Sequence, residues 1–103
     1  MATTAWVNVW GAPDLAAINT TLADLLADQL PATVSVNEDE SVTQRGFDGP
    51  PFWVEVWAPA IETERTIALK LYEALSERTP WRLELTVDDG LVLDERPAQL
   101  SPA

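Results

Sequence analysis

Residues 6–10 read Trp-Val-Asn-Val-Trp, and residues 53–57 read Trp-Val-Glu-Val-Trp. Each copy alternates valine with an aromatic or polar residue, which is the period-two pattern of a strand with two different faces. Each copy is followed by a proline and then by a helical pattern, and proline is favoured at the first turn of a helix. The repeat therefore predicts two units in one chain, each a strand followed by a helix.

The first unit continues with regular apolar spacing. Leucine and isoleucine recur at helical intervals from Leu15 to Leu30, so we expect one amphipathic helix over residues 13–30, ended by Pro31. Residues 32–37 alternate again and predict a second strand. Residues 38–51 have no periodicity and contain two glycines and a Pro-Pro pair, which indicates a long loop or an extended hairpin.

The second unit follows the same plan. Pro59 begins a helical pattern that should reach about Arg78, and residues 82–87 alternate as a further strand. Asp-Asp-Gly at 88–90 is typical of a tight turn, after which residues 91–94 predict a short return strand. We expect one domain over residues 1–95 and a flexible tail over 96–103.

The order of elements, with its repeat at an offset of 47 residues, predicts an α+β fold. Two β-α-β halves of this size are typical of a ferredoxin-like βαββαβ sandwich, with an antiparallel sheet of order 4-1-3-2 and both helices on one face. The return strand would then lie beside the fourth strand as an extra C-terminal hairpin strand.

In that topology the two repeated segments become the two central strands. Their valines should pack under the helices, because Asn8 and Glu55 would be costly to bury there without partners. The tryptophans then lie on the open side of the sheet, with Asn8 expected opposite Glu55. The predicted interaction surface consists of Trp6, Asn8, Trp10, Trp53, Glu55 and Trp57, and it continues outward to Thr33, Ser35, Glu84 and Thr86.

Composition narrows the classes of function. The 103 residues include neither Cys nor His, which removes thiol chemistry and the commonest general base and metal ligand. Seventeen acidic against six basic residues give a net charge of −11, which disfavours binding to nucleic acid or anionic membranes and suits a basic protein partner. No phosphate-binding loop, zinc spacing or dinucleotide fingerprint is present. We therefore expect no catalytic residue, metal or cofactor, and a cytoplasmic location because the N-terminus lacks a signal-peptide pattern.

Three functions remain compatible with four indoles on one sheet face. The first is self-association, in which the protein forms a homodimer through this face. The second is binding of a basic protein partner, with tryptophans as anchors and an acidic rim. The third is a small-ligand-binding protein, or a cofactor-free enzyme of the ferredoxin-like oxygenase type, with a pocket lined by Trp and Glu55. The expected function is thus non-enzymatic interaction or regulation, with ligand binding as the alternative.

Overall fold

A computed structural model of the chain describes residues 5–28, 30–87 and 90–99. The elements in chain order are β1 (Ala5–Trp10), α1 (Leu15–Thr21), α2 (Ala23–Ala27), β2 (Thr33–Glu38), α3 (Glu40–Thr43), β3 (Phe52–Trp57), α4 (Ile61–Arg78), β4 (Arg82–Val87) and β5 (Leu91–Arg96). None of the helices in these ranges combines the length and the apolar character needed to cross a lipid bilayer.

All five strands form one antiparallel sheet of order β2-β3-β1-β4-β5, which confirms the α+β class. The predicted order 4-1-3-2 differs from this sheet, which reads 5-4-1-3-2 from its other edge. The difference is the fifth strand: β5 pairs along β4 as far as Arg96 opposite Leu83, whereas the sequence indicated only a short return strand. The two repeated segments, β1 and β3, are adjacent near the centre of the sheet.

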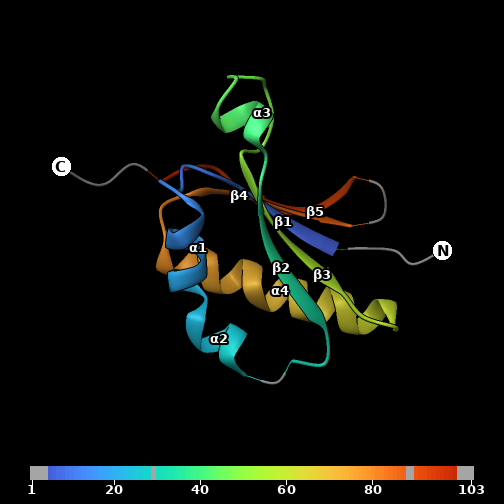
Figure 1. Cartoon of the computed structure of the whole chain (residues 1–103). Helices are drawn as coiled ribbons and strands as arrows, with labels where there is room; N and C mark the ends of the chain where they lie inside the picture. The colour runs from blue at the N-terminus through green and yellow to red at the C-terminus, as the bar shows by residue number, and fades with distance from the viewer. Residues whose placement is uncertain (1–4, 29, 88–89, 100–103) are drawn as a thin grey trace.

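Helices α1, α2 and α4 lie on one side of the sheet, and α3 lies beyond its end, at the tip of the connection between β2 and β3 (Figure 1). Helix α4 contacts β1, β3 and β4, whereas α1 contacts the edge strand β2. The valines of both repeated segments are completely buried beneath these helices, as predicted. The core also contains apolar residues of α4, among them Leu71 and Leu75, which are fully buried.

The helix expected over residues 13–30 is wrong in its bounds and its continuity. It begins one residue after Asp14, whose carboxylate caps it by accepting from the N–H of Ala17 at 2.8 Å. It is interrupted at Leu22 and ends at Ala27. At the interruption, Arg78 of α4 donates to the carbonyl oxygen of Thr21 at 2.9 Å, and a continuing helix needs that acceptor for its own next turn.

The connection between β2 and β3 is folded rather than extended. Asp39 caps the short helix α3 by accepting from the N–H of Ser41 at 3.0 Å. The N–H of Asp39 also donates to the carbonyl oxygen of Pro51 at 2.8 Å, which closes the base of the connection. Because the two ends are held together, β2 and β3 remain paired up to Glu38 opposite Phe52.

The last described residues run back toward α4. The N–H of Gln99 donates to the carbonyl oxygen of Pro80 at 2.8 Å. Arg96 donates to three carbonyl oxygens around the C-terminus of α4, those of Ser76, Thr79 and Trp81. These bonds satisfy acceptors that the end of a helix leaves unpaired, and they fix β5 to α4. Residues 100–103 of the expected tail lie outside the described residues.

Candidate functional site

The side of the sheet opposite α1, α2 and α4 carries all four tryptophans of the repeat; we call it the open face. Trp57 retains 44% of its accessible surface, and the other three indoles are half-buried. Glu55 between the two tryptophans of β3 is exposed. The fifth tryptophan, Trp81, packs against the core and is not part of this surface. Among the described residues, no helix covers this side of the sheet (Figure 1).

The strand registers place these side chains in rows across the sheet. In one row, Trp6 lies opposite Glu55 on β3 and opposite Thr86 on β4. In the next row, Asn8 lies between Trp53 on β3 and Glu84 on β4. Residues two apart along a strand share a face, so Trp6 is a diagonal neighbour of both Trp53 and Trp57.

The expected pairing of Asn8 with Glu55 is wrong. The register between β1 and β3 is shifted by two residues from the expected one, which keeps every side chain on its predicted face but changes its partner. The shift brings Phe52, 4% exposed, opposite the fully buried Val9. In the expected register Phe52 would lie opposite Gly11, beyond the end of β1. Packing of Phe52 therefore favours the observed register.

Asn8 instead bonds toward the other neighbouring strand. Its side-chain amide donates to Oε1 of Glu84 at 3.1 Å, and the hydroxyl of Thr86 donates to the same oxygen at 3.3 Å. Asn8 is 8% exposed and Thr86 2% exposed, so this is a mostly buried polar cluster within an aromatic surface. Such groups are stable when buried because they are hydrogen-bonded. The cluster fixes the position of one carboxylate on the open face.

Arg82 forms the corner of the open face next to Trp10. The two residues are opposite each other on β4 and β1, and the guanidinium carbon lies 4.1 Å from the centroid of the indole. This is a cation–π contact, in which the positive charge is attracted to the electron-rich ring face. The open face thus already has one indole, that of Trp10, in contact with a cation of the same chain.

The charge of the open face is mainly negative. Glu55 and Glu84 lie among the indoles, and Glu95 of β5 is opposite Glu84. In the described part of the chain, the strand registers place three carboxylates on this face and one basic residue, Arg82. The indoles are therefore interleaved with carboxylates and do not form one continuous apolar patch.

Among the described residues, three cavities lie away from the open face and are not lined by tryptophan or by Glu55. The largest, of about 550 Å³, follows the edge strand β2 on the helix side. The second, of about 340 Å³, lies between α4 and β5, and the third, of about 210 Å³, lies near the start of α4. Within the described ranges, no three acidic residues are grouped in a way that could hold a metal ion.

Sequence reasoning thus located the face of each candidate residue but not its partner. All six residues of the predicted surface share the open face, because alternation decides the side of a strand and β1 and β3 are adjacent. The contact between Arg82 and Trp10 was missed. The alternation of Arg82 with Glu84 and Thr86 was a usable signal for it, since Arg82 begins the strand that flanks β1.

Comparison with known proteins found no matching family model, curated protein or solved structure.

Proposed function

We propose that this protein is a non-enzymatic interaction protein whose open sheet face binds a protein partner carrying basic side chains. One observation carries the proposal: Glu55 is exposed at the centre of the sheet, opposite Trp6 and between the indoles of Trp53 and Trp57. Aromatic side chains next to carboxylates suit a lysine or arginine, whose stem packs on the ring while its charge meets the carboxylate.

The size of the indoles supports an anchoring role. A tryptophan buries about 150–250 Å² when covered, and tryptophan is enriched among the residues that dominate binding energy at interfaces. Trp57 is the most exposed of the four. A partner that covers it removes apolar surface from water at roughly 25 cal/mol per Å². Tryptophans supply affinity in this proposal, and the acidic residues select the partner.

Face-to-face packing of two copies is the competing form of the same proposal. It would bring the carboxylates of Glu55, Glu84 and Glu95 against the same three groups of the second copy, with Arg82 as the basic residue on each side. Opposed like charges in an interface are unfavourable, so the charge pattern supports a basic partner over this dimer. The ligand-binding alternative lacks such support, because none of the three cavities described above is lined by the indoles.

As part of this proposal, we interpret the fold as ferredoxin-like, and the order in which its strands and helices are connected supports this interpretation. Each half runs from a central strand through helix to an outer strand, and β5 is an addition at one edge. A sheet of this type has helices on one side only, which leaves the other side free for a partner.

A titration with model peptides tests the proposal. The probe is a peptide of alternating Lys and Leu, and its control is a peptide of equal length that alternates Glu and Leu; tryptophan fluorescence reports binding. We expect the basic peptide to bind and the acidic peptide not to bind. Trp57→Ala should weaken binding about tenfold, as for an interface anchor.

Charge variants complete this test. Glu55→Gln should weaken binding of the basic peptide by up to about fivefold, since an exposed ion pair contributes roughly 0.2–1 kcal/mol. Glu62→Gln is the matched control, because Glu62 is also exposed but lies on α4, on the helix side. Equal binding of both peptides, or equal effects of the two Glu variants, would contradict the proposal.

A further inference from the structure

The edge strand β2 lacks the features that discourage pairing with a further strand, whereas β5 at the opposite edge has them. Within the described ranges, β2 pairs only with β3, through six consecutive residue pairs without irregularity. Residues 33–37 of β2 are uncharged, and Glu38 is its single charged residue. A regular, neutral edge with free main-chain groups is a template for a further strand.

The other edge carries the features that discourage pairing. The pairing of β5 with β4 is irregular between Leu85 and Thr86. The second half of β5 is Asp94-Glu95-Arg96, and Pro97 follows. Charges, irregularities and proline are the usual means by which proteins block an edge. Leu91, Val92 and Leu93 of β5 are exposed, but they form only half of that strand.

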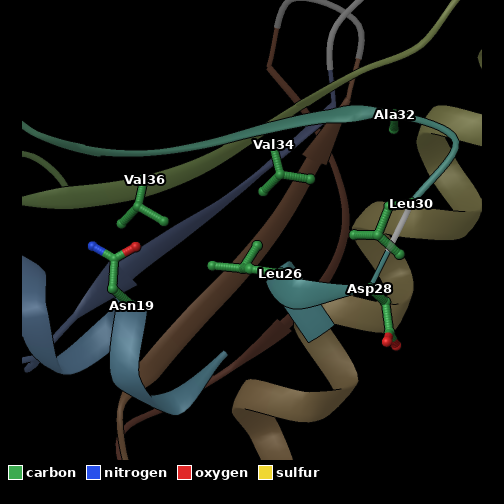
Figure 2. A pocket seen from close by; sticks show the side chains of 7 residues that line it. All are labelled: Asn19, Leu26, Asp28, Leu30, Ala32, Val34 and Val36. Carbon is green, nitrogen blue, oxygen red and sulfur yellow. The ribbon is translucent and has the colours of Figure 1, made fainter. Parts of the chain in front are cut away.

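A groove of about 550 Å³ follows β2 on the helix side (Figure 2). Five of its seven lining residues are half-buried apolar residues, and Asn19 and Asp28 are polar. Val34 points from the strand toward Leu26 of α2, and Val36 points toward Asn19 of α1. Within the described residues of α1 and α2, only Ile18 is buried, and Leu22 at their junction is buried as well. A strand added to β2 would place alternate side chains in this groove.

We propose that a second copy of this chain occupies the edge and the groove, by pairing its own β2 antiparallel to this β2 about a twofold axis. Paired residues in an antiparallel ladder share a face, which restricts the symmetric registers. The register centred on Ser35 places Val34 opposite Val36 of the second copy, and Val36 opposite its Val34. Apolar residues then meet on the groove side, and Thr33 meets Asn37 on the open side.

The charges of β2 suit this occupant. In the register centred on Ser35, Glu38 lies opposite Ala32 of the second copy, so no two carboxylates of the strands face each other. This matters for two chains that each carry a net charge of −11, because ionic strength screens distant charges but not opposed neighbours. Asn37 donates to the carbonyl oxygen of Ser35 at 3.2 Å, and this exposed local bond can give way to a neighbouring strand.

This dimer differs from the face-to-face form and leaves the proposed partner surface free. The axis runs through the sheet, so the two open faces lie on the same side of one continuous ten-stranded sheet. The two proposals are therefore independent, and they predict opposite responses to salt. Salt should tighten the dimer by screening repulsion between its acidic chains, but it should weaken binding of the basic peptide.

Molar mass in solution, measured by light scattering after size exclusion, tests the inference. At about 100 μM, a concentration at which weak micromolar dimers are populated, we expect twice the chain mass of 11.3 kDa. Val34→Lys places a charge in the groove and should raise the dissociation constant more than about a hundredfold. Val92→Lys is the matched control on the opposite edge, and Trp57→Ala is the control on the open face; both should remain dimeric.

A second variant distinguishes loss of the dimer from misfolding of Val34→Lys. Ser35 is exposed, so Ser35→Glu leaves the core intact but places two carboxylates together at the twofold axis, and it should also dissociate the dimer. Circular dichroism verifies that each variant is folded. A wild-type protein of single-chain mass would overturn the inference. So would a dimer that survives Ser35→Glu, or one that is lost with Val92→Lys or Trp57→Ala.

Discussion

Asn8 shows how strongly one residue's role depends on its neighbours across the sheet. It lies in the middle of a strand of buried valines and half-buried indoles, and its side-chain amide donates to Glu84. The carboxylate of Glu84 in turn accepts from Asn8 and from Thr86. The three side chains join β1 to β4 on the open face, and on the helix side Val7 and Val9 lie opposite Leu85 and Leu83.

Replacement of Asn8 by alanine should therefore destabilise the fold. The change removes a hydrogen bond to a charged acceptor and leaves Glu84 with one donor fewer in a half-buried position. We expect a loss of about 1.5–3 kcal/mol in the free energy of unfolding, measured by urea denaturation. Glu55→Gln, an exposed residue of the same face, should change stability by less than about 0.5 kcal/mol. Equal effects of the two changes would contradict the role assigned to Asn8.

Among the elements, the junction of α1 and α2 depends on α4. The guanidinium of Arg78, near the end of α4, contacts both oxygens of Asp24 at 2.7 and 3.0 Å and also binds the carbonyl oxygen of Thr21. This paired contact holds the interrupted helix against α4. The hydrogen bond from Arg78, assisted by its charge, lowers the pKa of Asp24 below the ordinary value of 3.8.

The stabilisation from this pair should depend on pH in a definite direction. A carboxyl group whose pKa is lowered by folding stabilises the folded state above its unfolded pKa, and this contribution is lost as the pH falls through the folded pKa. Arg78→Gln should therefore lower the melting temperature at about pH 7, and the difference from wild type should shrink below about pH 4. Thermal scans at both pH values measure it, with Asp24→Asn as the matched variant. A difference that is independent of pH would contradict the ion-pair origin.

For individual elements, the sequence predicts whether a segment is a helix or a strand better than it predicts the residues at which the segment begins and ends. Strand β4 has the expected bounds, residues 82–87, because alternation and a preceding proline mark it locally. The break at Leu22 depends on a side chain 56 residues away in the sequence, and no local pattern reports it. The register of β1 with β3 is ambiguous for a similar reason, since a shift of two residues satisfies the same alternation. Packing of Phe52 resolves that ambiguity only in three dimensions.

For the whole molecule, the net charge of −11 opposes compactness. Raising the NaCl concentration from about 0.02 M to about 0.5 M shortens the Debye length from roughly 20 Å to roughly 4 Å. The melting temperature should therefore rise, by about 4–8 °C for each kcal/mol of repulsion relieved in a domain of this size. Differential scanning calorimetry measures the change. The rise should be smaller at about pH 4, where many carboxylates are protonated; an equal rise there would point to a cause other than charge.

The adjacency of β1 and β3 also determines when the sheet can assemble. The strands of the first half, β1 and β2, do not pair with each other: β3 lies between them and belongs to the second half. During synthesis, β1 and β2 therefore have no common neighbour until residues 52–57 have left the ribosome. The sheet formed by β2, β3, β1 and β4 is then still incomplete, because β4 begins 25 residues after the end of β3. Most of its strand pairing is non-local, so we expect folding to be slower than in a helical bundle of equal length.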